Sequence, residues 1–234
     1  MGLFSLMALF WLLGKQVNRT FCTFMFSATL AASGFGSDDA SVEGVVELPP
    51  PGMERMLTAR YGANAEAPIT PSNPPAAMVY IEGNFPTKPK AVPGNVVQMT
   101  QKNLLFSPDL VAIPVGGTVA FPNLDDTYHN VFSYSKTKRF DLGRYRKDEK
   151  PALVTFEKPG VVTVHCEIHD RMRGTVLVLE TPYFQKTDSA GHYRLGHLPS
   201  GQFTLKAWVN DGDVREQSID LKSGAKLQVD FKKK

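Results

Sequence analysis

Cysteine is scarce in this sequence: of its 234 residues only two are cysteines, Cys22 and Cys166. Cys22 lies in an apolar N-terminal stretch that has the features of an export signal, so an exported mature chain keeps Cys166 alone. One cysteine excludes an internal disulfide, and a thiol in an oxidising compartment is vulnerable unless something occupies it. A metal ion is the expected occupant of that thiol.

An excess of charge of one sign is also missing. The formal net charge is +3, but residues 1–37 contain Lys15 and Arg19 and no acid, which leaves 24 basic and 23 acidic side chains in the remainder. A nearly neutral chain without a basic tract lacks the electrostatic footprint of a nucleic-acid-binding protein. We therefore expect no nucleic-acid partner.

No hydrophobic run is long enough to cross a bilayer. The N-terminus has two apolar pieces, residues 2–13 and 21–36, and neither reaches the roughly 20 residues that a spanning helix needs. The second piece follows positive charge and ends in small residues, as a secretory signal does. We predict that residues 1–37 are a signal peptide cleaved between Ala31 and Ser37, with a retained N-terminal anchor as the alternative. The mature chain would then be periplasmic or otherwise exported, without a membrane span.

The sequence is rich in turn formers, with 17 Pro and 19 Gly separating short Val-rich runs. This pattern predicts strands rather than helices. Residues 95–180 contain about seven or eight predicted strands, which indicates a β-sandwich. Val162, Val164 and Cys166 share one parity, so we expect them to face the core while His165 points to the opposite side.

A second β-rich segment covers residues 182–234, where about five strands are expected. Five strands are few for a self-sufficient sandwich. Two further strand-like stretches, "SVEGVVEL" at 41–48 and "AAMVYIEG" at 76–83, lie near the N-terminus. We predict that these early strands complete the second sandwich.

The nine residues "VHCEIHDRM" concentrate metal-binding side chains, with Cys166, His169 and Met172 spaced three and three. Thiolate and imidazole suit copper, zinc or iron, and a thioether as a further donor favours copper. A blue-copper centre needs a second histidine. His129 is the candidate, since it lies in the same predicted domain away from the cysteine. Asn130 beside it could join the two ligand loops by hydrogen bonds.

Other polar residues have simpler interpretations. Zinc is the alternative metal, with Asp170 or Glu167 completing the donor set. Asp125 and Asp126 are interpreted as turn-forming, solvated residues. The remaining histidines are predicted to lie on the surface: His192 and His197 in the second domain, and His165 as a solvent-facing strand residue with an electron-exit role as the alternative.

The "HN" pair at 129–130 and the "C-x-x-H-x-x-M" motif at 166–172, preceded by "KPG" and alternating valines, resemble the cupredoxin family, with a short loop of the amicyanin type. The resemblance covers residues 90–180. It implies one type 1 copper per chain, bound by His129, Cys166, His169 and Met172. Glu167 departs from the Thr or Ser of many cupredoxins, which we expect to alter the surroundings of the cysteine sulfur.

The stretch "TDSAGHYRLGHLPSGQFTLKAWV" resembles the carboxypeptidase regulatory-like (transthyretin-like) β-sandwich, whose opening strands match "VEGVV" and "AAMVYIEG" upstream. Residues 41–85 plus 182–234 would form this discontinuous domain. The expected fold is therefore all-β, a cupredoxin Greek-key β-sandwich inserted into a second, small transthyretin-like β-sandwich. Bacterial methylamine-utilisation and plastocyanin-like proteins resemble this combination.

These features predict an exported type 1 copper protein that carries single electrons to and from a redox protein. We expect His169 to be the exposed edge, bordered by Ile168 and Arg171. The His165–Cys166 pair is similar to part of a multicopper oxidase motif, but the sequence has no His-x-His pair for a second copper cluster. We therefore expect no enzyme activity. A copper carrier, a copper sensor or a cell-envelope scaffold without a redox role is the alternative.

Overall fold

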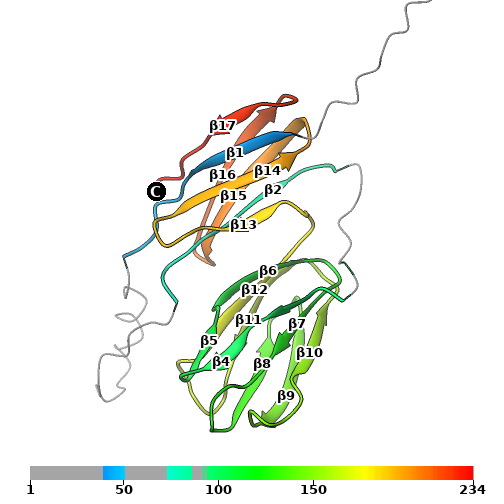
Figure 1. The fold of residues 1–234 in the computed structure, drawn as a ribbon, viewed down its shortest axis with the longest axis vertical. Coiled ribbons are helices and arrows are strands. Elements are labelled where there is room, and N and C mark those ends of the chain that lie inside the picture. The colour runs from blue at the N-terminus through cyan, green and yellow to red at the C-terminus, as the bar shows by residue number, and fades with distance from the viewer. Residues whose placement is uncertain (1–38, 51–72, 86–91, 93, 234) are drawn as a thin grey trace, which may run out of the picture. The chain divides into compact units, whose positions relative to one another are not determined.

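The computed structural model describes residues 39–50, 73–85, 92 and 94–233. These residues form strands β1 to β17 and no helix (Figure 1). No helix in the described part of the chain is therefore long and apolar enough to cross a membrane. The predicted signal or anchor of residues 1–37 lies outside the described residues. The all-β prediction is confirmed.

Two sheets build the sandwich that contains the cysteine. The larger sheet has the strand order β6 (Leu110–Pro114), β12 (Arg173–Leu179), β11 (Gly160–His165), β8 (His129–Tyr134) and β9 (Arg139–Tyr145). The smaller sheet consists of β10 (Ala152–Phe156), β7 (Gly117–Phe121) and β3 (Val96–Gln98). One buried apolar cluster takes side chains from both sheets, so the sheets pack face to face around a shared core.

The cysteine strand has the predicted alternation. Val162 and Val164 are completely buried and Cys166 is nearly so, whereas Thr163 and His165 on the other parity are half-buried. Because successive side chains of a strand point to opposite faces, the valines carry Cys166 into the core. The orientation predicted for β11 is confirmed.

The structure has more strands here than expected, ten from β3 to β12 instead of seven or eight. The extra strands include a small hairpin of β4 (Thr100–Lys102) and β5 (Leu105–Ser107). Its turn places Asn103 and Leu104 at φ values of 56° and 58°. A leucine rarely adopts a left-handed conformation, so the sequence gives no turn signal at this position.

The second sandwich also contains two sheets. One has the order β14 (His192–Leu198), β1 (Ala40–Val45) and β17 (Lys226–Gln228). The other has the order β13 (Phe184–Lys186), β2 (Met78–Glu82), β15 (Gly201–Asn210) and β16 (Asp213–Leu221). Both early strands lie between late ones, as the blue β1 and cyan β2 show among the orange and red strands of Figure 1. The early strands therefore complete this sandwich, as predicted.

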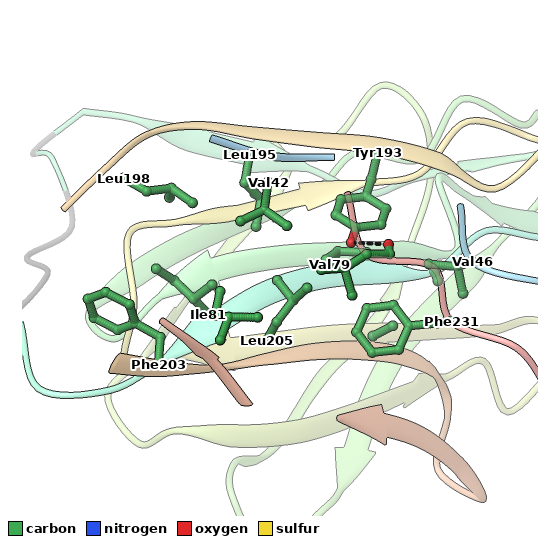
Figure 2. Packing of buried hydrophobic residues seen from close by; sticks show 14 of the residues in the cluster. Val42, Val46, Val79, Ile81, Tyr193, Leu195, Leu198, Phe203, Leu205 and Phe231 are labelled. Carbon is green, nitrogen blue, oxygen red and sulfur yellow. Dashed lines mark hydrogen bonds between the residues drawn. The ribbon is translucent and has the colours of Figure 1, made fainter. Parts of the chain in front are cut away.

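One cluster of buried apolar side chains from both sheets forms the core of the second sandwich (Figure 2). The Tyr193 hydroxyl in this core donates to the Val229 carbonyl at 2.7 Å, and burial raises the pKa of this tyrosine. Gly191 has a φ of 89°, and a Cβ there would collide with the Val46 carbonyl oxygen. The glycine of the "TDSAG" turn is therefore required by backbone conformation and by space.

Candidate metal centre

Three of the four predicted ligands bring their donor atoms together at one end of the first sandwich. Cys166 follows β11, His129 begins β8, and His169 lies in the loop between β11 and β12. Cys166 Sγ lies 3.9 Å from His129 Nδ1 and 3.7 Å from His169 Nδ1, and the two nitrogens are 3.0 Å apart. Among the described residues this is the group of His, Cys, Asp and Glu side chains that could hold a metal ion.

The size and chemistry of this triangle fit a transition metal. The point equidistant from its three atoms lies about 2 Å from each, which matches a bond between a first-row metal ion and an imidazole nitrogen. One thiolate and two imidazoles suit copper or zinc. Cys166 and His129 are buried, while His169 is half-buried. The burial of His169, and secondarily the nearby His129, lower the pKa of His169 and so favour the neutral imidazole that binds metals.

Met172 lies immediately before β12 and is completely buried in the same apolar cluster as Cys166. Its backbone N–H donates to the His169 carbonyl at 2.8 Å, and its own carbonyl accepts the Cys166 N–H at 3.3 Å. These two hydrogen bonds close the loop between the cysteine and the methionine. The loop therefore carries three of the predicted ligands as one compact unit.

Asn130 joins the two ligand segments, as predicted from the sequence. Its Oδ1 accepts the backbone N–H of Glu167 at 2.7 Å, and its Nδ2 donates to Asp141 Oδ1 at 3.3 Å. The side chain is 1% exposed. Glu167 itself turns outward and forms an ion pair with Arg144 at 2.6 Å. Its backbone thus secures the cysteine loop while its carboxylate lies near solvent.

The prediction that Asp125 and Asp126 are both solvated turn residues is wrong for Asp125. Asp126 is exposed and forms an ion pair with Lys147. Asp125 instead has a side chain that is 14% exposed, with Oδ2 at 2.9 Å from His129 Nε2. Burial raises the pKa of Asp125, but hydrogen bonds from Leu104 N–H, His129 and Asn103 N–H outweigh burial and lower it below the usual value.

A buried polar network behind this contact was not apparent in the sequence. Asn123 Nδ2 donates to the carbonyls of Thr127 and Tyr145, both at 2.9 Å. Gln101 Nε2 donates to the Tyr145 hydroxyl at 2.5 Å, and that hydroxyl donates to the Phe121 carbonyl at 2.6 Å. Burial raises the pKa of Tyr145, which keeps this hydroxyl protonated. The network fixes the chain segments that surround His129.

The other histidines lie outside the donor triangle. His165 is half-buried on the opposite side of β11, with its ring centroid 5.6 Å from that of Phe132. Burial first, and Arg173 second, lower the pKa of His165. His192 and His197 are exposed, as predicted. Both lie in β14, whereas His165, which was predicted to face solvent, is only partly exposed.

No protein-family model and no curated protein matches this sequence. Structural neighbours include the Cu-containing nitrite reductase from Thermus scotoductus, with 27% identity and a TM-score of 0.36 over 42% of this chain and 25% of the reductase. They also include a purple cupredoxin from Nitrosopumilus maritimus, with 26% identity and a TM-score of 0.32 over 36% of this chain and 99% of the cupredoxin.

A reduced Cu(I) form of an amicyanin mutant is a third neighbour, with 23% identity and a TM-score of 0.34 over 43% of this chain and 98% of the amicyanin. The matched part therefore spans a quarter of the reductase but nearly all of the two smaller proteins. TM-scores of this size are too low to assign a function to the chain. A function has to be inferred from the donor atoms of Cys166, His129 and His169 instead.

Proposed function

We propose that this chain is an exported type 1 copper protein that carries single electrons. The observation that supports this proposal best is the triangle of Cys166 Sγ, His129 Nδ1 and His169 Nδ1, in which Cys166 and His129 are buried. Met172, which is buried in the same apolar cluster as Cys166 and close to it along the chain, would be the fourth ligand. This donor set is the combination that type 1 copper centres use.

Bound copper would supply the one-electron chemistry, by alternating between Cu(II) and Cu(I). The residues of the chain would hold the donors still during this change. The loop from Cys166 to Met172 is closed by its own hydrogen bonds, and Asn130 connects it to the strand that carries His129. Ligands fixed in this way rearrange little between the two oxidation states, which favours electron transfer.

The proposed route for electrons is the exposed edge of His169. His169 is half-buried, and its neighbours Ile168, 39% exposed, and Arg171 lie at the surface. An apolar side chain beside a cation suits brief contact with another protein. The proposed partner is a redox protein that docks over this edge, and the carrier role predicts no turnover of a substrate.

The domain organisation is part of the proposal. Residues 90–180 would form the cupredoxin domain, inserted into a carboxypeptidase regulatory-like domain made of residues 41–85 and 182–234. The pairing of β1 with β14 and β17, and of β2 with β13 and β15, supports this division. Residues 1–37 would direct the chain to the periplasm or otherwise outside the cytoplasm.

The proposal can be tested by adding Cu(II) to the purified full chain and recording visible absorption and EPR spectra. We expect an intense thiolate-to-copper absorption band with narrow copper hyperfine splitting. The Cys166→Ser variant should lose the band, while His165→Ala, which changes the adjacent residue outside the triangle, should keep it. A band that survives in Cys166→Ser would refute the assignment.

The same protein can separate an electron carrier from a copper carrier. An electron carrier should be oxidised and reduced reversibly and should retain its copper in the presence of a competing chelator. Rapid release of copper to the chelator, with slow or irreversible redox cycling, would favour the role of a copper carrier or sensor. A colourless protein that binds one zinc ion would favour a structural role.

A further inference from the structure

Asp125 is the acceptor for three N–H groups from two parts of the chain. Its Oδ1 accepts the backbone N–H of Asn103 at 2.7 Å, and its Oδ2 accepts that of Leu104 at 3.0 Å. Oδ2 also lies 2.9 Å from His129 Nε2. An ionised carboxylate can only accept hydrogen bonds, so His129 Nε2 must carry the proton in this contact. His129 Nδ1 then has its lone pair directed into the donor triangle.

The contact between the two histidines agrees with this tautomer. The Nδ1 atoms of His129 and His169 are 3.0 Å apart, so a hydrogen bond between them needs one donor and one acceptor. If His129 is protonated on Nε2, then His129 Nδ1 accepts and His169 Nδ1 donates. Binding of a metal would therefore require the His169 proton to move from Nδ1 to Nε2 and the Cys166 thiol to lose its proton, while the ring of His129 is already prepared.

Asp125 is itself held in place from several directions. Its backbone N–H donates to Asn123 Oδ1 at 2.9 Å, and the backbone N–H of Leu124 donates to the Gln101 carbonyl at 2.8 Å. Asn123 is 4% exposed and Gln101 is completely buried. A carboxylate fixed at both its main chain and its oxygens can hold a histidine ring in one orientation.

We propose that Asp125 is a positioning residue of the metal centre: it fixes the tautomer and orientation of His129, and its negative charge strengthens the binding of Cu(II) more than that of Cu(I). The second part rests on the proposed copper function. A nearby anion stabilises the more positively charged ion more strongly. Asp125 therefore lowers the reduction potential of the bound copper.

The test compares Asp125→Asn with Asp126→Asn in the full chain. Both variants remove one negative charge at adjacent positions, but Asp126 is 84% exposed at its side chain and pairs with Lys147 rather than with His129. The affinities for Cu(II) and Cu(I) are measured by competition with chelators, and the reduction potential by redox titration. Loss of a carboxylate partner of a ligating histidine typically lowers metal affinity by about 10–100-fold.

For Asp125→Asn we expect a loss of Cu(II) affinity in this range and a smaller loss of Cu(I) affinity. Each tenfold difference between the two losses raises a one-electron potential by about 59 mV. Asp126→Asn should leave the potential close to that of the wild type. Equal potentials for the two variants would overturn the electrostatic part of the inference.

A measurement on the metal-free chain tests the positioning part independently of copper. The ¹⁵N and ¹H NMR signals of the histidine side chains report which ring nitrogen is protonated. We expect His129 to be protonated on Nε2 in the wild type and in Asp126→Asn, and to show a mixture of tautomers in Asp125→Asn. A wild-type His129 protonated on Nδ1 would overturn the inference. If the wild type fails to bind copper, the proposed function fails, yet this NMR measurement still decides the role of Asp125.

Discussion

The same Asp-x-x-x-His spacing occurs once in each sandwich, with different consequences. Asp125 and His129 are 2.9 Å apart in the first sandwich, and Asp188 and His192 are 3.0 Å apart in the second. The side-chain exposures are 14% and 0% for the first pair but 55% and 64% for the second. Distance and spacing are alike, and exposure to water distinguishes the two pairs.

Exposure changes the part that each carboxylate plays. In the second sandwich, Asp188 Oδ1 accepts the backbone N–H groups of Ala190 and His192 and so stabilises a surface turn. The exposed His192 ring contacts the other carboxylate oxygen, Asp188 Oδ2. Water and salt screen such a pair strongly. In the first sandwich the histidine is completely buried, so its carboxylate partner decides where the ring proton resides. Burial therefore makes a turn-forming motif into part of a metal centre.

The largest expected difference between the two pairs concerns metal binding. Replacing His129 by Ala should lower copper affinity by more than about a hundredfold, since loss of a ligand exceeds the effect of losing its carboxylate partner. His192→Ala should leave the affinity unchanged. Both variants can be compared by chelator competition and by the increase in thermal stability that the metal produces. Equal affinities in the two variants would remove His129 from the ligand set.

The next difference concerns stability without metal. Asp125→Ala leaves the ring N–H of the completely buried His129 without its acceptor, and should lower the free energy of unfolding by about 1–3 kcal/mol. Asp188→Ala removes contacts that water can replace, so its effect should be clearly smaller. Denaturant unfolding of the metal-free chain, followed by circular dichroism, provides the comparison. A larger loss for Asp188→Ala would contradict the importance of burial.

Most of the fold could be predicted because it depends on short-range patterns. Alternation placed Val162, Val164 and Cys166 in the core, and the strand deficit of residues 182–234 indicated that β1 and β2 belong to the second sandwich. The hairpin of β4 and β5 was missed because its turn uses Leu104 at a positive φ, against the preference of that residue.

The candidate metal centre could be predicted from the sequence only in part. Cys166, His169 and Met172 lie on one short loop, so their spacing alone indicated metal chemistry, and His129 followed from the scarcity of histidine. The role of Asp125 was not predictable, since its spacing to His129 recurs at Asp188 and His192 on the surface. Exposure to water distinguishes the two pairs, and Asp125 also accepts N–H groups from the turn at Asn103 and Leu104, which is distant in sequence.

A smaller loss of stability is expected when Asn130 or Asn210 is replaced. These two residues extend the comparison of buried and exposed contacts to uncharged side chains. Asn130, 1% exposed, accepts the Glu167 N–H, whereas Asn210 accepts the Gly212 N–H at 2.9 Å in an exposed turn of the second sandwich. Asn130→Ala should cost about 1 kcal/mol of the free energy of unfolding, because a partly buried hydrogen bond between the two ligand segments is lost. Asn210→Ala should cost less in the same denaturant titration. Comparable losses would show that burial is not the deciding factor.

The smallest expected effect is the pH dependence of the exposed pair. The hydrogen bond from the His192 ring, and then that from its backbone N–H, lower the pKa of Asp188. A carboxylate whose pKa is lower in the folded state stabilises the fold above its unfolded pKa of about 3.9, and this contribution disappears as pH falls through the folded value. Asp188→Asn should therefore be slightly less stable than the wild type near neutral pH and equal to it in strong acid.

Trp208 in β15 provides a fluorescence signal from the second sandwich, so denaturant titrations of the wild type and Asp188→Asn can be followed there at several pH values. Added salt should shrink the difference near neutral pH, because exposed charges are screened over roughly 10 Å at 0.1 M ionic strength. A difference that persists unchanged into strong acid would show that Asn at position 188 disturbs the turn itself. In that case the charge of Asp188 would not stabilise the fold, and the predicted pH dependence of this exposed pair would be refuted.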